Sequence, residues 1–298
     1  MATDTIAQRI QNQASRQPTA PAYHQKVGGA WKTTTWRGYA DQVRQAGKAM
    51  IALGLEPGQA VCIIGFNRPE WIVFNCGAFS VGGVPAGIYT TSSPEEVRHV
   101  IAHSGAPLLL VEDASQWAKV QSMRSELPQL RHVVSMRGCT LDDPSALTWD
   151  GFMAKAASVD DTVFDTRMAS LRDDQLATLI YTSGTTGPSK GVMLSHHNLA
   201  WTADVAQQIT NATATGCAVS YLPLSHIAEQ MTTILLPATA GATVYFAESI
   251  EKVPENLKEV QPTVVFGVPR IWEKFHAGVA AKLGQATGAK KRLVAWVR

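Results

Sequence analysis

The sequence predicts an α/β fold with layered, mostly parallel sheets flanked by helices. Compact apolar runs such as 60–65 are short enough to be buried strands. Between these runs lie segments whose apolar residues recur at helical spacing. The two kinds of segment alternate along most of the chain, which is typical of parallel strands joined by crossover helices.

The first half of the chain carries most of this alternation. Helices are expected where apolar residues recur every three or four positions, with Asp4 as a candidate N-cap and Gly54 at a helix end. The predicted helices are 5–17, 36–53, 69–81, 94–104 and 114–127. The predicted strands are 30–36, 60–65, 84–88, 107–111 and 132–135. Residues 137–172 are polar and break the rhythm, so a connecting region is expected there.

The alternation resumes in the second half. Strands are expected at 176–182, 191–195, 217–222, 242–246 and 263–267. Helices are expected at 197–210, 228–239, 253–260 and 269–283, the last with Pro269 in its first turn.

Composition excludes several classes of protein. A length of 298 residues allows one large domain or two smaller ones, and a net charge of +2 is too weak to indicate a nucleic-acid binder. Cys62, Cys76, Cys139 and Cys217 form no CxxC pair, which disfavours a zinc site and fits a reducing compartment. No secretory leader and no apolar run long enough to span a bilayer is apparent. We therefore expect a cytoplasmic protein.

The segment 181–191 reads YTSGTTGPSKG and is the strongest candidate site. It matches neither the Walker pattern nor GxGxxG, and a strand rather than a helix is expected after it. Its glycines would let backbone N–H groups converge on an anion, and its hydroxyls and Lys190 would add donors and charge, as a polyphosphate requires. The same residue types are also ordinary in surface loops, so composition alone leaves both interpretations open.

The order of residues in this segment resembles the phosphate-binding signature of the adenylate-forming enzymes, which include acyl-CoA synthetases, peptide-synthetase adenylation domains and luciferases. Two further stretches support the resemblance: YLPLSHIAEQ at 221–230, and FGVPRIWEKF at 266–275. The latter is similar to the VPRxxEK segment of long-chain and very-long-chain acyl-CoA synthetases. Within the family the strongest similarity is to fatty-acid ligases of the bubblegum group.

The resemblance implies a long-chain fatty acid–CoA ligase. Such enzymes use ATP and Mg²⁺ to convert a fatty acid to acyl-AMP, and coenzyme A then displaces AMP. Lys190 and His226 are the implied catalytic residues, with His226 near the adenylate and the acyl carboxylate. Thr182 is implied as a contact of Mg²⁺ as well as of the nucleotide. The phosphates would be held by Thr182, Ser183, Gly184, Thr185, Thr186, Gly187 and Lys190.

The resemblance also implies a domain organisation. Residues 1–298 correspond to an incomplete N-terminal AMP-binding domain, with 1–170 as a first α/β subdomain and 171–298 as the start of a second. The family's YGxTE segment, ribose-binding aspartate and mobile C-terminal domain are not found in these residues. We expect a fragment that binds nucleotide weakly and does not turn over. The expected partners are the fatty acid, ATP and coenzyme A, while peripheral contact with a membrane and the oligomeric state stay open.

Two alternatives stay open as well: an adenylate-forming enzyme for aryl or amino acids, and a non-catalytic interaction module. Other candidate sites are weaker. His99 and His103 have the spacing of a metal pair, yet no third ligand accompanies them, so surface or partly buried histidines are expected. Ser225 and His226 are adjacent in a chain without a GxSxG elbow, which argues against a serine hydrolase.

Overall fold

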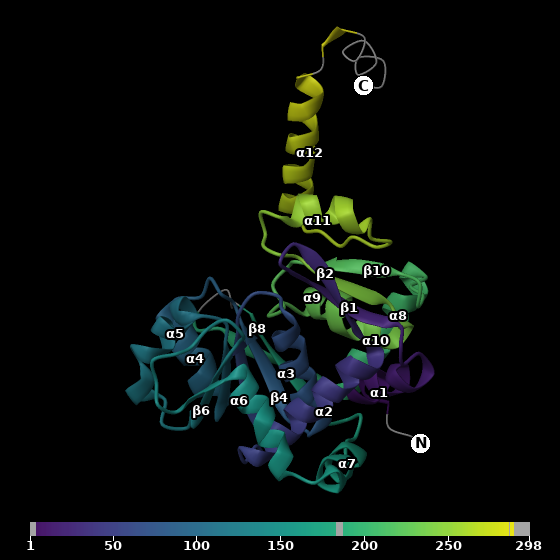
Figure 1. The fold of residues 1–298 in the computed structure, drawn as a ribbon. Helices are drawn as coiled ribbons and strands as arrows, with labels where there is room; N and C mark the ends of the chain where they lie inside the picture. The colour runs from purple at the N-terminus through teal and green to yellow at the C-terminus, as the bar shows by residue number, and fades with distance from the viewer. Residues whose placement is uncertain (1–3, 183–186, 286, 289–298) are drawn as a thin grey trace. The chain divides into compact units, whose positions relative to one another are not determined.

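The structure, a computed structural model, describes residues 4–182, 187–285 and 287–288 (Figure 1). The chain divides into two compact units, Met1–Val264 and Val265–Arg298. Each unit is described by itself. The boundary between subdomains expected near residue 170 stays a prediction.

The larger sheet of the first unit contains seven strands. Its strands run parallel to their neighbours except the last, β9, which is antiparallel to β8. In spatial order they are β7 (Ala146–Thr148), β6 (His132–Ser135), β5 (Leu108–Val111), β3 (Ala60–Ile64), β4 (Val84–Ile88), β8 (Leu176–Thr182) and β9 (Lys190–Ser195). The prediction of a mostly parallel sheet is confirmed.

The smaller sheet brings together strands that are far apart in sequence. Its order is β10 (Cys217–Ser220), β11 (Thr243–Phe246), β1 (Pro21–Val27) and β2 (Ala30–Thr35). β1 is parallel to β11 and forms an antiparallel hairpin with β2. The turn of that hairpin is Gly28-Gly29, both at positive φ, the backbone that two-residue hairpin turns require.

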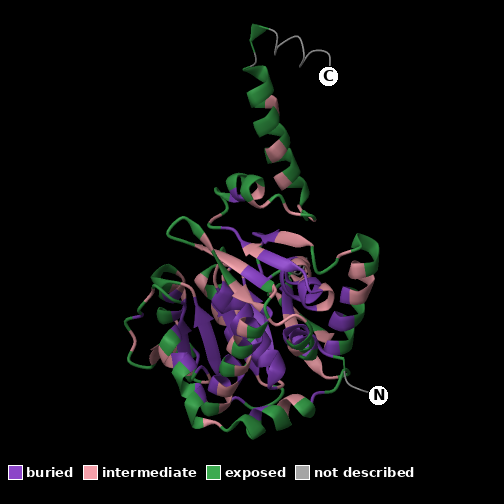
Figure 2. Cartoon of the chain, turned by 45° about the vertical axis from the view of Figure 1, so that its right-hand side comes forward, coloured by how far each residue is buried: buried purple, intermediate pink, exposed green. Residues whose placement is uncertain are grey.

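Helices cover both faces of the seven-stranded sheet. Residues along β3 alternate between two apolar clusters: Val61 and Ile63 pack on one side, Cys62 and Ile64 on the other. The first cluster includes α2 (Trp36–Ala52), α3 (Pro69–Ser80) and α6 (Trp149–Ala154); the second includes α4 (Pro94–Ser104) and α5 (Ala114–Gln121) (Figure 1). α3 is buried along its whole length, as a helix that is apolar on every side must be (Figure 2).

The remaining helices of the first unit complete its two layers. They are α1 (Ile6–Arg16), α7 (Asp161–Ala169), α8 (His196–Thr210), α9 (Ile227–Gln230), α10 (Leu236–Ala240) and α11 (Val253–Val260), with short turns η1 (Arg124–Glu126), η2 (Lys155–Ser158) and η3 (Met231–Leu235). The second unit holds α12 (Pro269–Gly284), where the Trp272 indole donates to the Gly267 carbonyl at 2.9 Å. No helix among the described residues combines the length and apolar character needed to cross a membrane.

Several expectations about local structure are wrong. Residues 137–172 are more than a connection, because they contain β7, α6 and α7. In these otherwise polar segments α6 buries Trp149, Phe152 and Met153, and α7 buries Phe164. At 263–267 there is only a single bridge between Ala218 and Val264. The helix expected over 228–239 is divided by the π-turn η3. Thr5, not Asp4, caps α1, because its side chain accepts from the Gln8 amide.

Close contact between α2 and α3 is testable at Gly77. A Cβ there would lie 2.8 Å from the Ala46 Cβ and 3.1 Å from the Gly47 nitrogen. Gly77→Ala should therefore push the helices apart and lower the free energy of unfolding by about 1–3 kcal/mol, measured by urea denaturation. Gly278→Ala on α12 is the control, because its added methyl meets nothing within 4 Å. Unchanged stability of the Gly77 variant would contradict this packing.

Candidate active site

The segment YTSGTTGPSKG forms the connection of an antiparallel hairpin. β8 ends at Thr182 and β9 begins at Lys190, and these two residues are paired across the strands. The loop therefore leaves the carboxyl end of β8 and leads into a strand, as the sequence predicts. Gly187 has a φ of 89°, which only glycine adopts readily. Four of the predicted phosphate-binding residues lie outside the described residues: Ser183, Gly184, Thr185 and Thr186.

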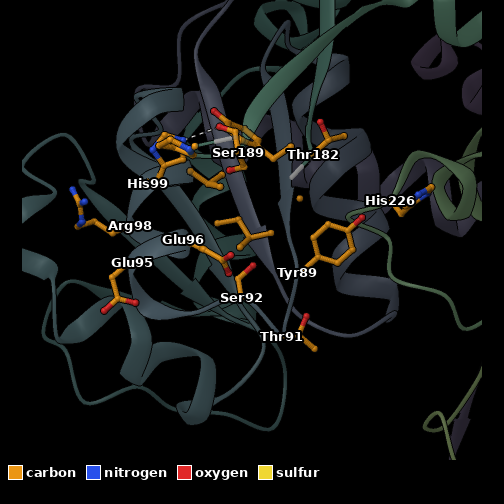
Figure 3. Close-up of a pocket in the computed structure, with 16 residues that line it drawn as sticks. Tyr89, Thr91, Ser92, Glu95, Glu96, Arg98, His99, Thr182, Ser189 and His226 are labelled. Carbon is orange, nitrogen blue, oxygen red and sulfur yellow. Dashed lines mark hydrogen bonds between the residues drawn. The ribbon is translucent and has the colours of Figure 1, made fainter. Parts of the chain in front are cut away.

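A cavity of about 960 Å³ opens where this hairpin leaves the sheet (Figure 3). It lies at the carboxyl ends of β4 and β8, which are parallel neighbours. The chain leaves β3 toward one face of the sheet and β4 toward the other, a change of direction at which α/β proteins commonly bind ligands. Its lining residues are Gly87, Ile88, Tyr89, Thr91, Ser92, Glu95, Glu96, Arg98, His99, Val100, Tyr181, Thr182, Gly187, Pro188, Ser189 and His226.

The cavity brings together some of the predicted site residues. Thr182, Gly187 and His226 line it, although His226 is distant from the hairpin in sequence. Lys190 is not among the described lining residues; it is exposed and follows Ser189 directly. No group of three His, Cys, Asp or Glu side chains in the described part of the chain could hold a metal ion. The assignment of Thr182 to Mg²⁺ stays a prediction.

His226 is oriented by its own helix. It is the N-cap of α9, and its Nδ1 accepts from the Ala228 amide at 3.1 Å. In the neutral ring the proton therefore resides on Nε2, which leaves an N–H free to donate. The preceding residue, Ser225, packs against β4 so closely that a Cβ on Gly87 would lie 2.7 Å from the Ser225 Cα. Glycine at position 87 thus allows the two chain segments to meet at the cavity.

A buried polar cluster holds the segment before His226. The Asn67 amide donates to the Ser220 hydroxyl and to the Leu222 carbonyl, both at 2.7 Å. Its side-chain oxygen accepts from the Leu224 amide at 3.3 Å. The Glu229 carboxylate accepts on one oxygen from Ser220 at 2.9 Å, Thr233 at 2.8 Å, the Tyr221 amide at 3.1 Å and Asn67 at 3.2 Å. We call Asn67, Ser220, Glu229 and Thr233 the polar hub.

Burial controls the protonation of Glu229, the carboxyl group of the polar hub. Glu229 is 2% exposed. Burial raises the pKa of its carboxyl from 4.5 to about 7, and the hydrogen bonds from Thr233 and Ser220 oppose that rise.

The part of the cavity formed by β4 and α4 was not predicted. Tyr89 follows β4, and α4 contributes Glu95, Glu96, Arg98 and His99. Both elements were predicted with the correct bounds, so the missing information was that β4 pairs with β8. The prediction that His99 and His103 are surface or partly buried histidines is confirmed, because His99 is half-buried and His103 is exposed. The His99 Nε2 lies 2.8 Å from the Ser189 carbonyl oxygen.

The fold and the cavity at the carboxyl ends of β4 and β8 define an α/β class of protein that has its candidate site at parallel strand ends. A sequence model of AMP-binding enzymes matches residues 10–297. The chain therefore belongs to the AMP-binding enzyme family.

Its relatives include fatty-acid ligases. The chain is 40% identical to the long-chain-fatty-acid–CoA ligase ACSBG2 of Homo sapiens over 99% of this chain and 45% of that protein. It is 35% identical to the long-chain-fatty-acid–CoA ligase ACSBG1 of Bos taurus over 91% of this chain and 38% of that protein. The chain thus spans less than half the length of these curated relatives.

Solved structures confirm the fold. The anthranilate CoA ligase AuaEII in complex with anthranoyl-AMP has a TM-score of 0.77 at 19% identity, over 90% of this chain and 50% of that chain. A fatty acyl CoA synthetase of Mycobacterium tuberculosis has a TM-score of 0.67 at 19% identity, over 85% and 47%.

Protonation of Glu229 gives a prediction about stability. Because its folded pKa is raised, its contribution is complete below pH 4.5 and is lost as pH rises to about 7. Relative to Glu229→Gln, which mimics the protonated acid, the parent chain should lose on the order of 3 kcal/mol between about pH 4.5 and about pH 8. Urea denaturation across this range measures the difference.

The control for this experiment is Glu255→Gln on α11, an exposed carboxylate paired with Lys252. It should retain the parent's fall in stability. A Glu229→Gln variant whose stability runs parallel to the parent at every pH would show that burial does not perturb this group.

Proposed function

We propose that this chain is the nucleotide-binding part of a ligase that activates a long-chain fatty acid with ATP and transfers it, through acyl-AMP, to coenzyme A. The observation that carries the proposal is the loop YTSGTTGPSKG, which opens beside a cavity at parallel strand ends in a member of the AMP-binding enzyme family. The named relatives, which are fatty-acid ligases, support this substrate class.

The cavity suits a nucleotide in size and in chemistry. Its volume of about 960 Å³ lies in the range of small-molecule sites. The hairpin side supplies hydroxyl and backbone donors at Thr182, Gly187 and Ser189, whereas α4 brings the carboxylates of Glu95 and Glu96. Repulsion from these carboxylates favours phosphates on the hairpin side.

In this proposal the protein acts mainly by positioning and by offsetting charge. The loop donors and Lys190 hold the phosphates, and the Nε2–H of His226 donates to the adenylate or to the acyl carboxylate. Mg²⁺, when bound, offsets phosphate charge, with the Thr182 hydroxyl as its ligand in this chain. The His226 ring needs no rearrangement for this role, because Ala228 already fixes its Nδ1.

We also propose where the chain acts in the cell and how its substrates reach it. All four cysteines are free thiols, which supports a reducing, cytoplasmic location. Fatty acid would reach the enzyme from membranes by peripheral contact, and coenzyme A would be the second substrate. We propose in addition that residues 1–170 form a first subdomain and that residues 171–298 are the start of a second.

Nucleotide binding by the chain is the first test. Isothermal titration calorimetry with ATP and Mg²⁺ should give a measurable dissociation constant. Lys190→Ala should weaken it about 10- to 100-fold, the effect of losing one hydrogen bond to a charged group. Lys258→Ala, which removes an exposed lysine of α11, should bind like the parent. If the parent chain binds no ATP, the interaction-module alternative replaces this proposal.

The acid can be tested in a chimera that carries residues 1–298 in place of the matching residues of the human relative. Palmitate should support formation of AMP and palmitoyl-CoA. Activity with an aryl or amino acid and none with palmitate would assign the chain to the other adenylate-forming alternative.

A further inference from the structure

Two histidines of α4 reach opposite ends of the phosphate-binding hairpin. His99 and His103 are four residues apart and therefore share one face of the helix. The His99 Nε2 lies 2.8 Å from the Ser189 carbonyl oxygen, the contact drawn as a dashed line in Figure 3. The His103 Nδ1 lies 2.8 Å from the Tyr181 hydroxyl oxygen. Tyr181 stands at the end of β8 and Ser189 directly before β9, so one helix contacts both limbs of the loop.

The two contacts are packed into a single cluster. The imidazole rings are stacked with centroids 5.4 Å apart, and the Tyr181 ring stands edge-on to both. Because a carbonyl oxygen can only accept, the His99 Nε2 must carry a hydrogen and donate it to Ser189. Both histidines thus have a defined hydrogen-bonding task, which accounts for their spacing without a metal ion.

α4 is a firm support for these contacts. Ser93 and Glu96 form a capping box at its start, and Gly105 ends it in the left-handed conformation. Val97 and Ile101 bury its inner face against the sheet. Since the peptide unit is planar, holding the Ser189 carbonyl also fixes the direction of the N–H that follows it at Lys190.

We propose that His99 is a positioning residue for nucleotide phosphates: its hydrogen bond to Ser189 sets the outgoing limb of the hairpin, and the His103–Tyr181 bond sets the incoming limb. This inference rests on the proposed function, in which the hairpin binds the phosphates. His99 acts through the backbone of Ser189, and adenosine recognition does not depend on it.

The test compares two substitutions of His99 in the 298-residue chain. Titration with ATP and Mg²⁺ should show affinity about 3- to 10-fold weaker for His99→Ala, the effect of one hydrogen bond. His99→Gln, whose amide can still donate to Ser189, should bind within about 3-fold of the parent. Inorganic pyrophosphate should follow the same pattern, while AMP should bind all three proteins equally. His197→Ala, an exposed histidine of α8, is the matched control.

The outcomes separate the two levels of the proposal. A parent chain that binds no ATP overturns the proposed function. A parent that binds ATP, together with a His99→Ala variant of equal affinity, overturns the positioning role alone. Equal losses for His99→Ala and His99→Gln, or a loss of AMP binding, would indicate direct contact with the ligand and also overturn it.

The hydrogen bond between His103 and Tyr181 can be tested independently. Tyr181→Phe and His103→Phe each remove the same hydrogen bond while keeping an aromatic ring. Each should weaken ATP binding about 2- to 5-fold, and the double variant should be no weaker than either single one. Additive losses would show that the two side chains act separately, and would contradict a role for the His103–Tyr181 hydrogen bond in positioning the hairpin. Thermal melting of every variant checks that the fold is retained.

Discussion

The hydrogen bonds of the polar hub are the interaction on which the rest of the structure depends. Asn67 lies shortly after the end of β3, a strand of the seven-stranded sheet. Ser220 is the last residue of β10, a strand of the four-stranded sheet, and the two side chains are hydrogen-bonded. Glu229 lies on α9 and accepts from both. The two sheets are therefore joined by buried, directional hydrogen bonds as well as by apolar packing. Because hydrogen bonds require a defined geometry, they fix the position of one sheet against the other more tightly than apolar contacts alone would.

The contact between the two sheets also determines the shape of the cavity. One wall is the segment that ends in His226, held by the hub and packed on Gly87. The opposite wall is the hairpin, held to α4 through Ser189 and Tyr181. His99 and His226 consequently stand at opposite ends of the cavity (Figure 3). Each wall is anchored by hydrogen bonds to an element that is distant in sequence.

The sequence predicts what depends on local patterns and misses what depends on pairing. β4 and α4 have the expected bounds, because apolar spacing and the Ser93 cap are local signals. The contact of His99 with Ser189 joins residues 90 apart and follows only from the pairing of β4 with β8. β1 went unpredicted because its strand contains polar residues; the Gly28-Gly29 turn was the available signal. Residues 183–186, on which much of the site prediction falls, lie outside the described residues.

The hydrogen-bond energies at Glu229, compared with its burial penalty, explain why an acid rather than an apolar side chain occupies this position. One carboxylate oxygen accepts from four donors, and every one of them is enclosed with it. An apolar residue would remove the burial penalty of a carboxyl. It would also take this acceptor away from the Ser220 and Thr233 hydroxyls and from the Tyr221 amide, at about 1–3 kcal/mol each. That sum is comparable to the whole stability of a typical domain, about 5–15 kcal/mol. A raised pKa is thus the smaller of the two penalties, because a proton on Oε2 relieves the charge while Oε1 still accepts the hydrogen bonds.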